Sequence, residues 1–457
     1  MKKGFTLIEL LGVIVILGIL VLVAFPPLLN QIKKSKSEIK ESTKLLIIDA
    51  AKDYIEDNKN NFDKIEGITY CININTLIEN NYINENLQSE NLEKIDQTKK
   101  IKMIYHNNKY NYEITENCTN YSLTRNNIEV PIVAENSGLY KSTTDIDRFI
   151  YRGGNPINNW IELNEGTDQS PSYIKYRIIS FEPDGTIKVV REESLDNMFF
   201  DDPDGYETEN RNSTSETSYC TSEDGCHIWG NQENTYYNGK SLSELNMDVI
   251  GFYFLKSSQN SEPILQQYSI IGKVTEDSTL NKYLNNTWIS TKQMKDHITN
   301  HSFYVGGLYY NGANIPKDAK TEKLEQQMYT WYGQIGLINT FEYVEASTNP
   351  TCTNVFSTYY YNPAYYYDGA QHLTEINDWP CSNTNYAWMN NLTSFYTINF
   401  QTPVSYNVWR VASNGPVTHN RTKSASNFIK PRPAFYLKSN ITLTGEGSES
   451  NPYRIME

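Results

Sequence analysis

An apolar run near the N-terminus constrains this chain more than any other feature. From Phe5 to Phe25 the residues are apolar apart from a threonine, Glu9 and the glycines. A helix rises about 1.5 Å per residue, so the run matches a hydrocarbon core that is about 30 Å thick. An ordinary secretory signal ends in an Ala-x-Ala-like cleavage site, and the sequence around Ala24 fits that site poorly. The run therefore predicts a membrane-spanning helix.

Glu9 is an ionisable side chain inside this run. A carboxylate within hydrocarbon is costly, and such residues commonly have a function and a charged partner. The alternative is a tolerated carboxylate close to the membrane interface, since Glu9 lies about one helical turn from Phe5. The residues alone leave both interpretations open.

Residues 2–11, KKGFTLIELL, resemble the type III signal of type IV prepilins and pseudopilins. This resemblance covers about the first thirty residues. It implies that a prepilin peptidase cuts after Gly4 and methylates the new N-terminus at Phe5. Glu9 would then match the family's membrane glutamate and pair with the Phe5 amine of a neighbouring subunit, which removes two isolated charges. The implied partners are other pilin subunits, the prepilin peptidase and membrane lipid.

The length of 457 residues predicts two or three domains. The predicted fold class is α+β. A long N-terminal helix, half in the membrane and half amphipathic, carries a small α+β pilin-like head and a larger, irregular, β-rich C-terminal domain. The predicted bounds are 1–4 for the leader, 5–58 for the helix (5–25 in the membrane), 59–125 for the small domain and 126–457 for the large domain.

Turn signals locate several elements within the two domains. In the small domain we expect a short helix within 76–83 and a hairpin of 101–104 with 110–114, because Asn-rich pairs favour tight turns. In the large domain Asp184-Gly185 predicts a hairpin of 176–180 with 186–190. Two further stretches are predicted to be helices, namely 279–284 and 319–329. The segment from 406 onward is predicted to form short strands.

The larger region resembles a family of uncharacterised surface domains from low-GC Gram-positive bacteria. The resemblance rests on several short motifs, namely YRGGNP at 151–156, YRII at 176–179, TLNKYLN at 279–285, IGLI at 335–338, VWRV at 408–411 and RPAFYLK at 432–438. The layout is similar to C-type-lectin-like and formylglycine-generating-enzyme-like folds, in which irregular loops sit on a small twisted sheet. The resemblance assigns no activity to named residues.

The six cysteines are predicted to form disulfides in an oxidising exterior. Six cysteines allow fifteen connectivities, and proximity in sequence favours one of them. A metal site is the alternative, but the chain has no Cys-x-x-Cys pattern. The favoured pairs are Cys71–Cys118, Cys220–Cys226 and Cys352–Cys381.

Aromatic residues concentrate between and just beyond the last two cysteines. Rings with polar tips suit carbohydrate or protein surfaces, and they also suit the half-buried filling of an irregular domain. We predict that the cluster as a whole forms a ligand surface. The expected ligand is a glycan or a protein, of a host or of another surface. Its candidate residues are Tyr359, Tyr360, Tyr361, Tyr365, Tyr366, Tyr367, Trp379 and Trp388.

Two patterns bear on metal binding, and each favours the plainer interpretation. The segment from Asp201 to Glu209 is rich in carboxylates, but it lacks the twelve-residue calcium-loop pattern, so a solvated acidic turn is favoured. His297 and His301 are four apart and would share a helix face, yet no glutamate follows His297 as the zinc-protease pattern requires. A polar surface pair is favoured, and no metal or cofactor is predicted.

The remaining signals limit the classes of function. The formal charge of −14 argues against direct nucleic-acid binding, which needs clustered Lys and Arg. The chain has neither a nucleophile elbow nor a phosphate-binding Gly-rich loop, so no enzyme is predicted.

We therefore expect a minor or tip pilin that begins in the cytoplasmic membrane and displays a binding or adhesion domain outside the cell. The alternative is a pseudopilin of a type II secretion or competence DNA-uptake machine, and a third reading is a surface enzyme on a pilin stalk.

Overall fold

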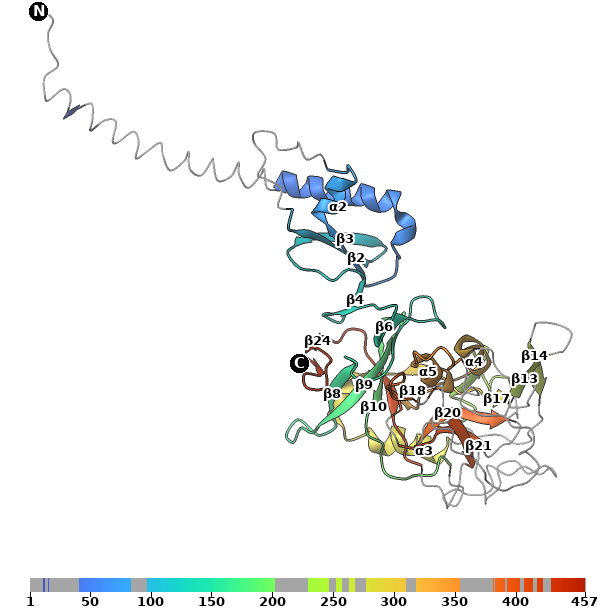
Figure 1. The fold of residues 1–457 in the computed structure, drawn as a ribbon. Coiled ribbons are helices and arrows are strands. Elements are labelled where there is room, and N and C mark those ends of the chain that lie inside the picture. Colours follow the sequence, from blue (N-terminus) through green and yellow to red (C-terminus); the bar gives the residue numbers. More distant parts are fainter. Residues whose placement is uncertain are drawn as a thin grey trace, which may run out of the picture. The chain divides into compact units, whose positions relative to one another are not determined.

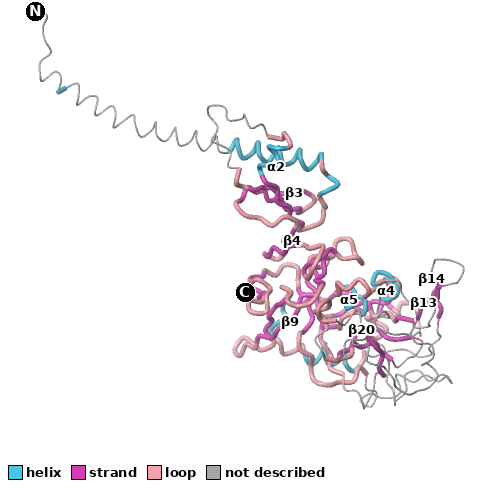
Figure 2. Tube along the Cα trace, viewed as in Figure 1, coloured by secondary structure: helices cyan, strands magenta, loops and turns pink. Residues whose placement is uncertain are grey.

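The computed structural model divides the chain into two compact units, Met1–Thr124 and Arg125–Glu457. Both units are built mostly from sheets with few helices (Figures 1 and 2). The residues that the structure describes are 11–12, 15, 41–83, 97–201, 229–245, 252–256, 263–267, 277–309, 318–353, 381, 383–390, 393–402, 407–413, 417–421 and 429–456.

The first unit packs a helix against an antiparallel sheet (Figure 1). Residues 41–57 are helical, and the side chains of Ile47, Ala51 and Ile55 are buried at the four-residue spacing of one helix face. Within this unit the strand order is β3-β2-β1-β4. The other elements are η1 (Lys59–Asn61), β1 (Ile68–Asn73), α2 (Ile74–Glu79), β2 (Lys100–His106), β3 (Lys109–Thr115) and β4 (Ser122–Arg125).

The expected hairpin of the first unit is confirmed as β2 and β3, which pair antiparallel through His106 and Lys109. Asn107 and Asn108 form the turn with φ of 51° and 63°. Positive φ at both central residues is the requirement of a type I′ turn, and asparagine tolerates it better than most residues. The short helix expected within 76–83 is also present, as α2.

The second unit is organised around a sheet with the strand order β15-β23-β10-β9-β8-β25-β24, to which β19, β6 and β7 are attached. Its central strand β10 is buried along its whole length. The strands are β6 (Gly138–Lys141), β7 (Phe149–Arg152), β8 (Trp160–Asn164), β9 (Tyr173–Phe181), β10 (Ile187–Arg191), β15 (Ile298–Thr299), β19 (Ile335–Gly336), β23 (Ala434–Leu437), β24 (Leu443–Thr444) and β25 (Tyr453–Ile455). The chain enters the unit through β5 (Ile128–Pro131).

The hairpin expected around Asp184-Gly185 is confirmed as β9 and β10. Gly185 has a φ of 86°, which only glycine adopts at little cost. Asp184 accepts hydrogen bonds from the amide and the hydroxyl of Thr186, at 3.0 and 2.7 Å. These local hydrogen bonds explain why the turn could be predicted from the sequence.

Smaller sheets complete the second unit, with the strand orders β12-β11-β18-β16 and β17-β20-β21-β22 and a separate β13–β14 pair. Their strands are β11 (Thr235–Tyr237), β12 (Lys240–Ser241), β13 (Phe252–Lys256), β14 (Pro263–Gln267), β16 (His301–Tyr304), β17 (Leu308–Tyr309), β18 (Tyr329–Gly333), β20 (Phe395–Thr402), β21 (Asn407–Val411) and β22 (Val417–Arg421).

Helical elements of the second unit fall partly where the sequence predicted them. The first stretch forms α3 (Thr279–Lys282) and continues as the π-helix η4 (Tyr283–Trp288). The second forms α4 (Ala319–Gln326), which is shorter than expected because Tyr329 already begins β18. Two elements were not predicted, the 3-10 helix η5 (Gln293–His297) and α5 (Thr340–Glu345).

The predicted membrane helix lies almost entirely outside the described residues. Of the span 5–25 the structure describes only Leu11, Gly12 and Val15, which are helical. Within the described part of the chain, none of the helices has the length and apolar character that a membrane crossing requires.

The Cys71–Cys118 disulfide closes a long loop in the first unit, and this generates a prediction. The two cysteines are 47 positions apart, so their bond restricts the unfolded chain considerably. Replacing both with serine should lower the free energy of unfolding of the first unit by about 3 kcal/mol. Hydrogen exchange of peptides from 41–83 and 97–124 in the full chain, in detergent, measures this loss.

The second unit supplies the control for this experiment. All seven tryptophans of the chain lie at or beyond position 160. Tryptophan fluorescence therefore reports unfolding of the second unit alone, and its midpoint should not change in the double variant. Unchanged exchange in the first unit would contradict the assigned role of the bond.

Candidate functional site

The residues expected to act in processing and assembly, Gly4, Phe5 and Glu9, lie outside the described residues. Their neighbours Leu11 and Val15 are described, and these side chains are 58% and 53% exposed.

The disulfide between Cys352 and Cys381 closes the aromatic segment, and its partners are 29 positions apart. Residues 354–380 lie outside the described part of the chain, so Tyr359, Tyr360, Tyr361, Tyr365, Tyr366, Tyr367 and Trp379 stay a predicted surface. Cys220 and Cys226 also lie outside it. The segment between Cys352 and Cys381 is called the disulfide loop below.

Trp388 does not belong to a ligand surface, which corrects the sequence expectation. Its side chain is only 1% exposed. The indole Nε1 donates to the carbonyl of Tyr151 at 2.9 Å, and the Trp388 amide donates to the carbonyl of Gly153 at 2.7 Å. The guanidinium of Arg177 lies 4.9 Å from the ring centroid. Trp388 therefore anchors the chain just beyond the disulfide loop onto the core.

The glycines of the YRGGNP motif make this anchoring possible. A Cβ atom on Gly154 would lie 2.3 Å from the carbonyl oxygen of Asn385, which is closer than any real contact. Gly153 pairs with Ala387 in a parallel bridge. On the other side of the disulfide, the Thr348 amide donates to the carbonyl of Tyr386 at 2.9 Å. The motif and the disulfide together fix the base of the loop.

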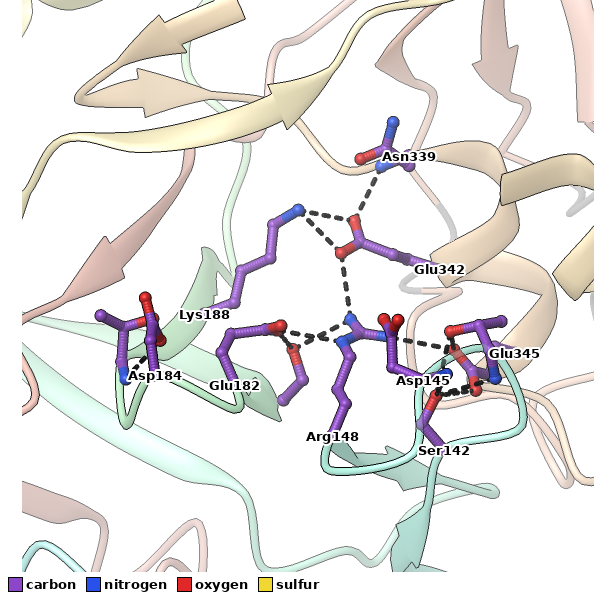
Figure 3. Close-up of polar contacts among 12 residues, drawn as sticks. Ser142, Asp145, Arg148, Glu182, Asp184, Lys188, Asn339, Glu342 and Glu345 are labelled. Carbon is purple, nitrogen blue, oxygen red and sulfur yellow. Dashed lines mark hydrogen bonds and ion pairs between the residues drawn. The ribbon is translucent and has the colours of Figure 1, made fainter. Parts of the chain in front are cut away.

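The second unit also contains a buried ion network, which is shown in Figure 3. It is defined by Arg148, Glu182, Lys188, Glu342 and Glu345. Arg148 precedes β7, Glu182 follows β9 and Lys188 lies on β10, while both remaining glutamates lie on α5. The network therefore ties the central sheet to a helix that is distant in sequence.

Arg148 is the centre of the network, and its side chain is 3% exposed. Its Nε atom lies 3.0 Å from Glu182, its Nη1 atom 3.0 Å from Glu345 and its Nη2 atom 3.2 Å from Glu342. Nη2 also donates to the hydroxyl of Ser180 at 3.0 Å. One guanidinium thus bonds three carboxylates through its planar fork of donors.

Lys188 provides the second positive charge. Its Nζ atom donates to both carboxylate oxygens of Glu342 at 2.7 and 2.9 Å. The backbone amide of Asn339 donates to the same carboxylate at 2.9 Å, which is the reciprocal half of a capping box at the start of α5. The Glu342 side chain therefore fixes both the ion pair and the helix N-terminus.

Neutral donors satisfy the remaining carboxylate. Glu345 Oε1 accepts from the Ser142 hydroxyl at 2.6 Å and from the Thr143 amide at 2.8 Å, and Oε2 accepts from the Thr144 hydroxyl at 3.2 Å. The 142–144 turn therefore provides the donors that a third buried carboxylate requires.

The pKa values of the network follow from burial and mutual attraction. Burial opposes ionisation of Glu182, but the Arg148 charge and the Ser180 hydroxyl outweigh it and lower the pKa of the carboxyl. Burial also opposes the charge on Arg148, and the carboxylates of Glu182, Glu345 and Glu342 outweigh it and raise the guanidinium pKa. For Lys188 burial prevails over the attraction of Glu342, so its pKa is lowered.

The environment of Asp201 also differs from the one predicted from the sequence. The prediction of a solvated acidic turn is wrong for this residue, which is 0% exposed. Its Oδ1 atom accepts from the amide and the hydroxyl of Thr279, at 3.0 and 3.2 Å, at the start of α3. Residues 202–209 lie outside the described residues.

His297 and His301 do not share a helix face, because His297 ends η5 and His301 begins β16. The His301 ring stacks on Tyr436 with centroids 3.7 Å apart, and its Nε2 atom lies 3.2 Å from Asp184. Among the described residues no group of three or more His, Cys, Asp or Glu is arranged to hold a metal ion.

We predict that Arg148→Met destabilises the second unit by about 3–5 kcal/mol, because it leaves three buried carboxylates without their shared cation. Urea unfolding of the full chain in detergent, followed by tryptophan fluorescence, measures the loss. Lys430→Met removes an exposed charge from the same unit and serves as the matched control. A loss below about 1 kcal/mol would contradict the central role of Arg148.

The lowered pKa of Glu182 predicts acid sensitivity of the second unit. A carboxyl whose pKa is lower in the folded state than in the unfolded state stabilises the fold. Its contribution is complete above the unfolded-state pKa, about 4.3, and is lost as the pH falls through the folded-state pKa. The free energy of unfolding should therefore fall below about pH 4.3, and Glu182→Gln should flatten that fall. Glu446→Gln, at an exposed position, should leave the slope unchanged. Equal slopes in wild type and Glu182→Gln would refute this assignment.

Comparison with known proteins bears on the N-terminal segment. Residues 1–25 match the family described as prokaryotic N-terminal methylation motif. Neither the comparison with curated proteins nor that with solved structures gave a match. Residues 1–25 are therefore a prepilin-type segment, which implies a membrane-anchored, surface-exposed subunit and supports a type IV pilin-like or pseudopilin-type role for the chain.

Proposed function

We propose that this chain is a minor or tip subunit of a type IV filament that displays its second unit outside the cell as a binding head. The observation that carries the proposal is the methylation motif at residues 1–25. A prepilin peptidase cuts after Gly4 and methylates Phe5. The N-terminal segment that begins at Phe5 then leaves the membrane and enters the filament.

Exposed apolar side chains in the N-terminal part of the chain support this role. Leu11, Val15 and Leu45 are 58%, 53% and 60% exposed in the isolated chain. Exposure of apolar side chains to water is unfavourable, so these residues favour burial against lipid or against neighbouring subunits. In the filament Glu9 pairs with the Phe5 amine of a neighbouring subunit, which compensates both charges.

Two further features support an exported binding head. The disulfides Cys71–Cys118 and Cys352–Cys381 suit an oxidising exterior. The second unit spans Arg125–Glu457, and so large a head is harder to repeat along a shaft than a compact one. The disulfide loop, fixed at its base, is the surface through which the head contacts a glycan or protein.

Intact mass and N-terminal sequencing of the protein from its native membrane test the proposal. The expected chain begins at N-methylated Phe5. Gly4→Val should block processing, whereas Gly12→Ala should not, because Gly12 lies away from the cleavage site. Among the described residues a Cβ at Gly12 also meets no atom within 4 Å beyond its own helix backbone and chain neighbours. A wild-type chain that retains Met1 would overturn the proposal.

Glu9→Gln separates processing from assembly. The variant should still begin at methylated Phe5, because the cleavage site is intact. It should be lost from the sheared filament fraction, because the amide carries no charge to pair with the neighbouring amine. If deletion of the gene abolishes secretion or DNA uptake while surface filaments keep their binding, the pseudopilin role replaces the filament role.

A further inference from the structure

A cavity of about 70 Å³ opens on the second unit between β8, β25 and η5. Strand β8, which lines the cavity, is labelled in Figure 1. Register explains how it forms. In β8 Glu162 lies beside Arg454 of the parallel strand β25, and Asn164 lies beside Tyr173 of β9. Gln293 and His297 of η5 line the cavity as well. We refer to this cavity as the β8–β25 pocket.

The polar groups of the pocket are only partly used by the protein. Glu162 Oε2 accepts from Arg454 Nε and Nη2 at 3.0 and 2.6 Å. The Asn164 amide donates to Gln293 Oε1. Within the described part of the chain no hydrogen bond occupies Glu162 Oε1, Arg454 Nη1 or the side-chain nitrogen Nε2 of Gln293. The pocket therefore presents both donors and an acceptor.

Apolar surface accompanies these groups. The ring of Tyr173 lines the pocket and is 55% exposed, with the Arg454 guanidinium 5.8 Å from its centroid. Leu163 and Met294 also line the pocket and are 2% and 1% exposed. A partly exposed aromatic ring thus accompanies the polar groups.

We propose that the β8–β25 pocket binds one neutral sugar residue of a glycan, and this proposal rests on display of the second unit at the cell surface. A sugar hydroxyl both donates and accepts hydrogen bonds, and so matches the mixture of unused groups. The C–H face of a sugar ring packs on an exposed aromatic ring such as Tyr173. The Glu162 and Arg454 charges cancel, which disfavours a strongly anionic or cationic ligand.

Size limits the ligand further. Pockets for drug-sized ligands have volumes of about 300–1,000 Å³, whereas this one has about 70 Å³. It therefore admits the edge of a single ring, as at the end of a glycan chain. So small a contact implies a dissociation constant on the order of 1 mM.

The test uses the full chain in a detergent without a sugar headgroup. The probes are the methyl glycosides of glucose, galactose, mannose and N-acetylglucosamine, and saturation-transfer NMR measures their binding. At least one should bind. Tyr173→Ala should weaken that binding about tenfold, because the aromatic face is lost. Tyr332→Ala, which removes a tyrosine that is 48% exposed on β18, is the matched control and should not change it.

Glu162→Gln adds a test of polar recognition, because it keeps the shape of the side chain but replaces an acceptor by a donor. It should weaken binding while Glu446→Gln does not. The pocket assignment fails if none of the four glycosides binds at tens of millimolar, or if Tyr173→Ala binds as wild type does. This outcome is independent of processing at Phe5. If the chain is methylated at Phe5 but binds no sugar, only the pocket assignment is wrong. If the chain binds sugar but retains Met1, only the filament role is wrong.

Discussion

The second unit depends on the charge of Arg148. A guanidinium buried in the core needs partners for its charge and for its donors, and Glu182, Glu342 and Glu345 supply them at 3.0–3.2 Å. Two of these carboxylates belong to α5, so the helix is fixed against the sheet by charge as well as by packing. Cys352 follows α5 closely, and the base of the disulfide loop thus rests on the same network.

Local chemistry made part of the fold predictable. Asn107-Asn108 and Asp184-Gly185 identify their hairpins because a tight turn constrains its own residues. Burial hid other elements. All six residues of α5 are buried, so no polar face marks its helical period. Lys188 interrupts an apolar strand, and only the burial of β10 on both faces reveals its role. The lectin-like layout of the large region stays a prediction.

The candidate sites were likewise predictable only where local sequence defines them. The prepilin-type segment was identifiable because its characteristic motif consists of consecutive residues. Trp388 and Asp201 were misassigned because composition cannot distinguish an exposed aromatic or acidic residue from one whose polar atoms are satisfied inside the core. The β8–β25 pocket escaped notice because Glu162, Gln293 and Arg454 are far apart in sequence and meet only through strand register and a short helix.

The pairing of β10 with β23 governs when the head can fold. Ile187 pairs with Leu437, so two strands that are far apart in the chain lie side by side in the central sheet. Contacts between such distant residues form late, since the entropy of closing the loop must be overcome first. The second unit is therefore expected to fold slowly, because its central sheet can form only after strands far apart in the chain have met.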